Sequence, residues 1–142
     1  MTATTANKTI PYYTPSDPAD IGAATQALAE RVDTLLTGAW QTPALTNSWV
    51  DFDTAMFAAT AYRKIDTHVR LRGMVKLGTL AAAIFTLPAG YRPPKTVSFT
   101  VMSNNATARV DVTAAGVVSV QAYGTGGSNA FVSLDQVAFF TD

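Results

Sequence analysis

The sequence predicts a mainly β protein that has one short helix near its N-terminus. From Trp40 onward, apolar residues alternate with polar ones at a period of two, which is typical of strands with one buried face. Gly, Pro and Asn interrupt these strands at intervals of roughly ten residues, as in a β-sandwich or barrel. Apolar residues recur with the period of a helix before Trp40. No such helical pattern interrupts the strands predicted after Trp40.

We divide the chain into three segments. Residues 1–16 are expected to form an extended arm, residues 17–38 a helix, and residues 39–142 the β-domain. A chain of 142 residues is near the usual size of one domain and can bury one sizeable core. We therefore expect one domain with a small appendage.

The arm contains little from which a core could be built. A stretch rich in Thr and Ala comes first, and an apolar cluster follows at Ile10, Pro11, Tyr12 and Tyr13. A disordered tail is one interpretation of this composition. The apolar cluster favours a second interpretation, in which the arm docks on a partner or on a neighbouring subunit.

The helix has a clear start and a clear end. Asp17 stands at the N-cap and Pro18 at the first helical position, while Thr37 and Gly38 end the helix near Leu36. Apolar or small residues at spacings of four and three form the seam of a coiled coil, namely Ile21, Thr25, Leu28, Val32 and Leu35. Because a lone helix of this length is marginal in water, it needs a partner. We expect self-association, and packing on the chain's own β-domain is the alternative.

The clearest strand runs from His68 to Leu77. Its inner face is predicted to hold Val69, Leu71, Gly73, Val75 and Leu77, and its outer face His68, Arg70, Arg72, Met74 and Lys76. Lys95–Met102 repeats the alternation, and a hairpin is expected around the turn Ala114–Gly116. Two short strands, Phe131–Leu134 and Val137–Phe140, close the domain.

Composition excludes several classes of partner and chemistry. The net charge is zero, so no global field attracts nucleic acid or anionic lipid. Charged residues make up only 14% of the chain, and part of the uncharged surface is therefore expected to face other subunits. The chain has no cysteine, which excludes disulfides, thiolate metal sites and a cysteine nucleophile.

No segment predicts export or membrane insertion. Met1–Ile10 lacks the apolar core of a secretory signal, so we expect synthesis in the cytoplasm without a signal peptide. The most apolar run, Leu80–Leu87, is far shorter than the roughly 20 residues that span a bilayer. We expect it to form a buried strand.

The groups needed for catalysis are scarce. His68 is the single histidine and cannot form a metal cluster alone, and Glu30, the single glutamate, lies on the helix. The chain contains no Gly-x-Ser-x-Gly motif. Asp51 and Asp53 could hold Ca²⁺ or a sugar hydroxyl, joined by Asp66 if the fold allows it, but a solvated face is the simpler interpretation. We predict a protein that is not an enzyme and binds no cofactor.

Two further features have simple interpretations. The Gly124–Gly127 segment opens no helix, so we expect a flexible loop and not a phosphate cradle. Arg70, Arg72 and Lys76 form a basic stripe on one strand face. Such a stripe could bind an acidic glycan or a phosphate-bearing polymer, but pairing with Asp51, Asp53 or Asp66 on neighbouring strands is favoured.

The segment Phe-Thr-Leu-Pro-Ala-Gly-Tyr-Arg-Pro at Phe85–Pro93 ends a strand and turns the chain. It occurs together with Tyr62–Lys64, Val69–Gly73, Val132–Asp135 and Phe139. With these segments, residues 45–142 resemble the C-terminal domain of bacteriophage tail-fibre, receptor-binding and related virion-fibre proteins.

The resemblance implies an antiparallel β-sandwich or jelly-roll-like head that forms a homotrimer. The helix would be a trimeric coiled-coil neck, and the arm would attach the head to other virion proteins of the tail or capsid. The chain has no long shaft and no enzymatic insert. A head fibre or capsid decoration protein without a required ligand is therefore the alternative to a tail fibre.

Domains of this kind commonly recognise host-surface carbohydrate through their loops. Turn tips offer amide, hydroxyl and aromatic groups that suit sugars. The resemblance therefore points to Asn104, Asn105, Tyr123 and Ser128 as candidate glycan contacts.

Overall fold

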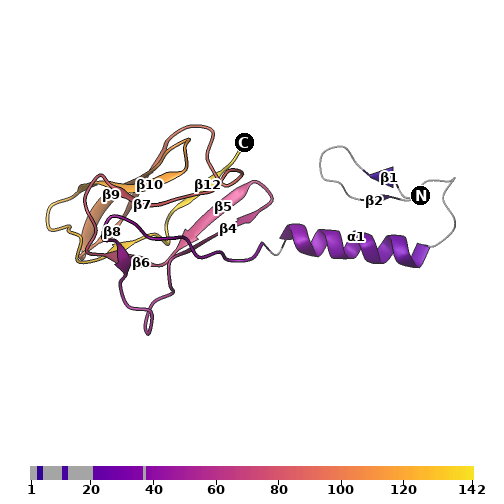
Figure 1. Ribbon diagram of the computed structural model, residues 1–142, viewed down its shortest axis with the longest axis horizontal. Coiled ribbons are helices and arrows are strands. Elements are labelled where there is room, and N and C mark those ends of the chain that lie inside the picture. The colour runs from indigo at the N-terminus through magenta and orange to yellow at the C-terminus, as the bar shows by residue number, and fades with distance from the viewer. Residues whose placement is uncertain (1–2, 5–10, 13–20, 37) are drawn as a thin grey trace. The chain divides into compact units, whose positions relative to one another are not determined.

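The computed structural model describes residues 3–4, 11–12, 21–36 and 38–142. The chain divides into two compact units, Met1–Gly38 and Ala39–Asp142 (Figure 1). The first unit contains the helix and a pair of short strands, and the second is the β-head. Each unit is described by itself below.

The N-terminal unit contains a strand pair where the sequence predicts an extended arm. Strands β1 (Ala3–Thr4) and β2 (Pro11–Tyr12) pair antiparallel. The described part of the arm is therefore a strand pair and not one extended segment. Pairing gives hydrogen-bond partners to backbone groups that an isolated strand would leave unsatisfied. Ile10 and Tyr13 of the predicted docking cluster lie outside the described residues.

Helix α1 spans Ile21–Leu36, so its end agrees with the prediction. The predicted start at Asp17 and Pro18 lies outside the described residues. Within the predicted seam, Thr25 is exposed, and Leu28 and Val32 are each 40% exposed. The seam side chains of Ile21 and Leu35 lie outside the described residues. No helix in the described part of the chain is long and apolar enough to cross a membrane.

The β-head consists of two antiparallel sheets. In chain order its strands are β3 (Val50–Asp51), β4 (Ala61–Ile65), β5 (His68–Arg72), β6 (Met74–Lys76), β7 (Ala83–Thr86), β8 (Val97–Ser103), β9 (Ala106–Val112), β10 (Val117–Tyr123), β11 (Val132–Ser133) and β12 (Ala138–Phe140). The larger sheet has the order β3-β6-β11-β8-β9-β10-β7, and the smaller has the order β12-β5-β4. A mainly β, antiparallel head with a short N-terminal helix is thus confirmed.

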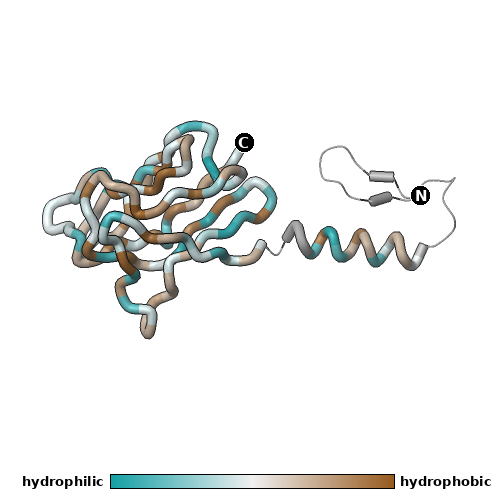
Figure 2. Tube along the Cα trace, in the orientation of Figure 1, coloured by the Kyte–Doolittle hydropathy of each residue, from teal (hydrophilic) through white to brown (hydrophobic). Residues whose placement is uncertain are grey.

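The predicted alternation builds the core. Hydrophobic and hydrophilic residues alternate along the strands of the head (Figure 2). Half of the 18 residues in the core cluster are valines, among them Val69, Val75, Val110 and Val120, which are fully buried. Strand β8 follows the predicted pattern, and Gly116 forms the β9–β10 hairpin turn with a φ of 84°. In β10 the predicted inward series holds at Val118 and Val120, but a register shift after Val120 leaves Ala122 exposed. Valine suits these positions because its branched side chain packs well on a pleated sheet.

The predicted single strand His68–Leu77 is in fact divided at Gly73. Strand β5 belongs to the smaller sheet and β6 to the larger one, so the chain changes sheets between them. Gly73 has a φ of 102°, and a Cβ atom there would lie 2.7 Å from the Cα atom of Thr60. Only glycine tolerates both that conformation and that approach.

The division at Gly73 overturns two predicted orientations. Met74 was expected to face outward, but it is buried, and Leu77 was expected to face inward, but it is 60% exposed. The left-handed residue Gly73 interrupts the alternation of faces, and Leu77 itself has a φ of 67°. Leu80 is also exposed, so only the central part of the apolar run, β7, is a buried strand.

One ion pair stands on the outer face of strand β9. Arg109 donates two hydrogen bonds to the carboxylate of Asp111, at 2.9 Å from Nε and 2.6 Å from Nη2. These hydrogen bonds lower the pKa of Asp111, whereas its burial raises it. A hydrogen bond from Ser98 also lowers the pKa, and the net effect is a pKa below the usual value. The folded state therefore favours the charged carboxylate.

Replacing Gly73 by Ala should destabilise the head severely. The left-handed conformation alone costs about 1–3 kcal/mol for a residue with a side chain, and the contact with Thr60 adds to that cost. Gly90→Ala is a matched control, because Gly90 also has a positive φ but has no atom near the position of its Cβ. Urea unfolding should show a larger loss for Gly73→Ala than for Gly90→Ala, and equal losses would contradict the close contact.

Asp111→Asn should remove a pH-dependent part of the stability. Because folding lowers the pKa of Asp111, its contribution is full above the unfolded value of 3.8 and is lost as the pH falls through the lower folded value. Urea midpoints measured between pH 7 and pH 2 should therefore converge for the two proteins at the acidic end. Asp142→Asn controls for loss of an exposed charge. A difference that stays constant with pH would argue against the ion pair.

Candidate functional site at the loop end of the head

Two loops meet at one end of the head, which we call the loop end. They are the Asn104–Asn105 turn between β8 and β9 and the Gly124–Phe131 segment after β10. The Asn104 side chain donates a hydrogen bond to the Gly126 carbonyl at 3.3 Å, and its backbone N–H donates to the Phe131 carbonyl at 3.1 Å. The segment that begins at Ala39 enters the head at the other end (Figure 1).

The turn at the loop end requires residues that adopt a left-handed backbone. Asn104 and Asn105 have φ values of 44° and 61°, and the pair connects β8 to β9 as a tight hairpin. Asparagine tolerates this conformation better than other residues with a side chain. Asn105 is exposed, so its amide is available to a ligand.

The glycine-rich segment is held in place, which corrects the predicted flexible loop. The Gly124 N–H donates to the Thr107 carbonyl at 2.8 Å, and the Gly127 N–H donates to the Gly124 carbonyl at 2.8 Å. A Cβ atom at Gly124 would lie 2.4 Å from Thr107 Oγ1, and one at Gly127 would lie 2.7 Å from the Thr107 carbonyl oxygen. The glycines thus permit close packing of the loop on strand β9.

Ser128 has a structural role in the same loop. Its N–H donates to Ser103 Oγ at 3.0 Å, and Ser103 Oγ donates to the Ser128 carbonyl at 2.7 Å. The Ser128 hydroxyl in turn accepts a hydrogen bond from the Ala130 N–H at 3.2 Å. These contacts fix the loop against the end of strand β8.

Tyr123 differs from the other three candidate contacts. Its ring packs against the core, and its hydroxyl is buried without a hydrogen-bond partner in the described part of the chain. Burial raises the pKa of this phenol. The loop end therefore brings together Asn104, Asn105 and Ser128, whereas the Tyr123 hydroxyl points away from solvent.

An aromatic cluster beside the loop end was not predicted from the sequence. The ring of Phe52 lies 5.4 Å from that of Phe131 and 5.7 Å from that of Phe57. Lys76 Nζ lies 5.4 Å from the centre of the Phe52 ring. Phe52 separates Asp51 from Asp53, the two carboxylates for which the sequence suggested a ligand. Partly exposed rings next to amide groups suit a ligand with both polar and apolar faces.

The two carboxylates beside Phe52 accept hydrogen bonds from residues of the segment between β3 and β4. Asp51 accepts hydrogen bonds from the N–H and hydroxyl of Thr60, at 2.8 and 2.6 Å, and Asp53 accepts one from the Ala55 N–H at 3.0 Å. Nowhere among the described residues do three His, Asp or Glu side chains gather as a metal site would require. This pair therefore shapes the loop between β3 and β4.

Arg72 of the predicted basic stripe and Arg63 of the neighbouring strand β4 both contact Trp40, which was not predicted from the sequence. The guanidinium carbon of Arg72 lies 4.3 Å from the centre of the Trp40 ring, and that of Arg63 lies 4.6 Å from it. The ring of His68 packs at 5.1 Å against that of Phe140. The cation–π contacts of Arg63 and Arg72 cover the ring of Trp40, which lies near the beginning of the head.

We compared the chain with known proteins. No protein-family model matches it, and no curated protein matches its sequence. Its structure is similar to that of the receptor binding protein (gp15) of Listeria phage PSA, with a TM-score of 0.66 and 17% sequence identity. The match covers 89% of this chain and 82% of that one. At this identity the similarity shows the fold alone, and the chain thus has the fold of a phage receptor-binding protein.

Proposed function

We propose that this chain is a non-enzymatic bacteriophage virion protein whose β-head binds host-surface carbohydrate. The observation that carries the proposal is the structural similarity to a receptor binding protein over 89% of the chain. The β-head supplies 104 of the 142 residues, so this coverage extends into the N-terminal unit.

The chemistry of the loop end supports carbohydrate as the ligand. Asn105 presents an exposed amide, and Phe131 a partly exposed ring. Sugars offer hydroxyl groups to amides and apolar ring faces to aromatic side chains. The loop is fixed by hydrogen bonds, which reduces the entropy cost of binding. Contact would be non-covalent.

Helix α1 is the proposed neck of a homotrimer. Leu28 and Val32 are exposed apolar residues one turn apart on the predicted seam. A helix that buries such a seam against copies of itself gains the stability that it lacks alone. In this proposal the arm, with Ile10, Pro11, Tyr12 and Tyr13, attaches the trimer to other virion proteins.

The neck can be tested with Leu28→Asp. A charge in the seam should dissociate the oligomer, so the mass in solution should fall from three times the chain mass of 15.0 kDa to that of one chain. Ala27→Asp is the matched control, because Ala27 is exposed and lies off the seam. Sedimentation equilibrium measures both proteins. A wild-type chain that is already a monomer at micromolar concentration would contradict the trimer.

The glycan site can be tested with Asn105→Gly and Phe131→Ala. Glycine keeps the left-handed turn and removes only the amide, so the fold should persist. Each variant should bind at least about tenfold more weakly to an array of bacterial surface polysaccharides, a loss of about 1.4 kcal/mol. Gln136→Ala, at another exposed position, should bind like the wild type.

Absence of wild-type binding to such an array, and to bacterial cells, would argue against receptor recognition. Locating the labelled chain on virions by electron microscopy then separates the alternatives. A few copies at the tail fit the proposed role. Many copies over the shell would instead indicate the head fibre or capsid decoration protein.

A further inference from the structure

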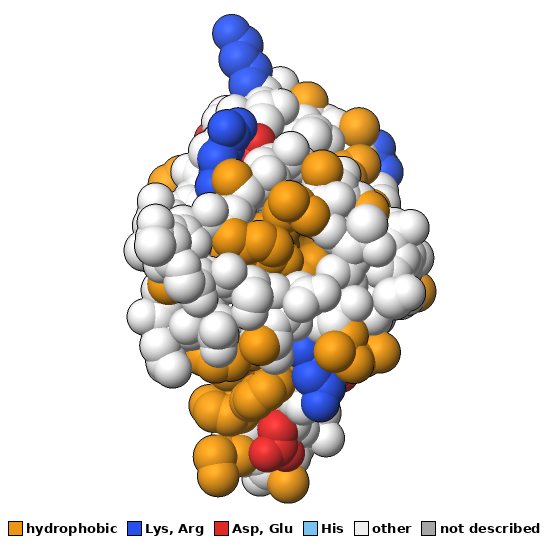
Figure 3. Space-filling model, turned by 90° about the vertical axis from the view of Figure 1, so that its left-hand side faces the viewer, with side chains coloured by type: hydrophobic (Ala, Val, Ile, Leu, Met, Phe, Trp, Pro, Cys, Tyr) orange, Lys and Arg blue, Asp and Glu red, His pale blue; other side chains and the backbone are white. Residues whose placement is uncertain are grey.

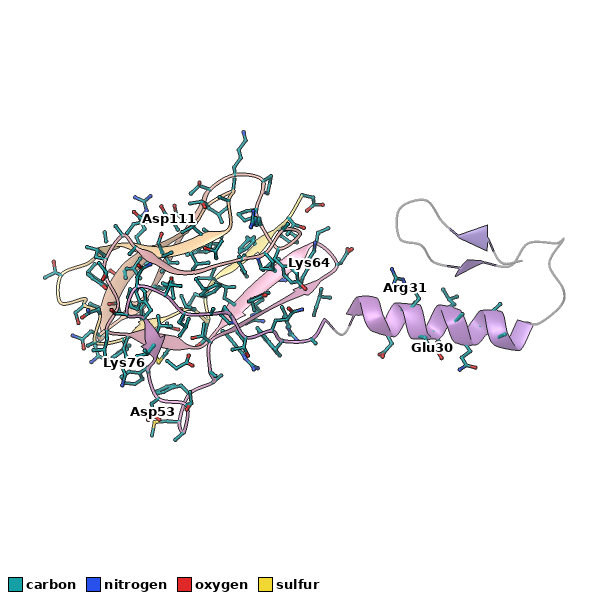
Figure 4. The ribbon with its side chains drawn as sticks, viewed as in Figure 1. Glu30, Arg31, Asp53, Lys64, Lys76 and Asp111 are labelled. Carbon is teal, nitrogen blue, oxygen red and sulfur yellow. The ribbon has the colours of Figure 1, made fainter. Side chains whose placement is uncertain are left out.

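A short apolar loop projects from the head between β3 and β4. We call residues 53–59 the knob. Met56 at its tip is 77% exposed, and Phe57 beside it is 36% exposed. Hydrophobic side chains gather on the lower tip of the face in Figure 3, at the height where Figure 4 places Asp53.

The knob is an ordered protrusion. The Phe57 N–H donates to the Asp53 carbonyl at 2.8 Å, which closes a turn, and the Asp51 carboxylate holds Thr60 across the base. The Phe57 ring rests against Phe52. The exposure of Met56 is therefore imposed by the fold, and a water-exposed apolar tip of this kind typically marks an interaction surface.

A groove of complementary chemistry lies elsewhere on the head, between strands β8 and β12. Its volume is about 590 Å³, and it is lined by Pro94, Lys95, Val97, Ser98, Phe99, Ala138, Phe139, Phe140 and Asp142. The lining is mostly apolar, and Phe140 is 60% exposed. This volume lies within the range of about 300–1,000 Å³ that is typical of binding pockets in proteins.

The groove exists because two strands diverge. Strand β11 pairs with β8 only at Val132 and Ser103, and its continuation β12 pairs with β5 in the other sheet. Within residues 38–142, β8 and β12 belong to different sheets and do not pair with each other. The gap between these strand edges therefore opens to the surface over Phe139 of the core.

The positions of knob and groove require a second molecule. The chain end next to the groove lies at the top of the head in Figure 1, whereas Asp53 of the knob lies at the bottom in Figure 4. One head cannot insert its knob into its own groove. Contacts between two different surfaces of identical chains are heterologous, and they close into a ring when the rotation allows it.

The charges around both surfaces are also complementary. Asp53 is exposed at the base of the knob, and Lys95 is exposed in the lining of the groove. Lys76 lies beside the knob, over Phe52, and Asp142 lines the groove. Opposite charges of this kind fix the register of a contact more than they strengthen it.

We infer that the knob of one copy inserts Met56 and Phe57 into the β8–β12 groove of the next copy. The heads then form a closed ring, in which each copy gives one knob and accepts one. This inference rests on the proposed self-association, and it adds a second interface to the one formed by α1. It also assigns an occupant to each of the two apolar surfaces.

Cross-linking tests the contact directly, because the natural chain has no cysteine. We would prepare Met56→Cys and Phe140→Cys as separate full-length proteins, mix them, let the subunits exchange and oxidise the mixture. The expected result is a disulfide-linked heterodimer as the main product. Met56→Cys alone and Phe140→Cys alone should remain uncross-linked, since a heterologous contact does not bring identical positions together.

Leu80→Cys mixed with Phe140→Cys is the matched control, because Leu80 is exposed but belongs to neither surface. That mixture should give no specific product. Self-linking of Met56→Cys would overturn the inference, since it requires a symmetric contact. Absence of the heterodimer in a protein whose mass is still trimeric would overturn the inference and leave the proposed neck intact, whereas a monomeric mass would contradict both.

Discussion

The structure of the head depends on the change of sheet at Gly73. Strands β5 and β6 form one continuous path, and so do β11 and β12, and both paths pass from one sheet to the other at the same place. The Gly73 N–H donates to the Asp135 carboxylate at 2.9 Å, and its carbonyl accepts from the Leu134 N–H at 2.8 Å. The backbone of Thr60 packs directly against Gly73. This joint connects the two sheets.

Both surfaces of the proposed head contact follow from that joint. Strand β12 pairs with β5 in the smaller sheet, whereas β8 belongs to the larger sheet. The two strands therefore diverge, and the groove opens between them. The knob begins after β3, which pairs with β6, and it is followed directly by Thr60, which packs on Gly73. Packing at one glycine therefore influences the knob and the groove together.

The sequence predicted the parts of the fold that depend on local alternation. Strand β8 agreed with prediction because its faces alternate without a break. The β9–β10 hairpin formed as predicted, although a register shift in β10 after Val120 interrupts the alternation. Met74 and Leu77 were assigned to the wrong faces because a period of two carries no information about a left-handed residue at Gly73.

Gly124 was interpreted as flexible for a similar reason, since its role depends on contact with Thr107 in another strand. The loop end was predicted in part from turn residues, but the Phe52–Phe131 contact joins segments far apart in the chain, and no local pattern could predict it.

Self-association at the neck would change the energetics of every weaker contact in the protein. Once α1 holds three chains together, the heads are at a high effective concentration, so a small knob–groove interface can form without being stable between free heads. The same argument applies to the loop end. In the proposed assembly, one amide and one aromatic ring would provide a weak carbohydrate site, and three such sites on one particle would bind a repetitive surface far more tightly than one. An exposed apolar seam on α1 and an exposed apolar knob on the head are unfavourable in an isolated chain. Their joint presence is consistent with one assembly in which the neck gathers the chains and the heads set their mutual orientation.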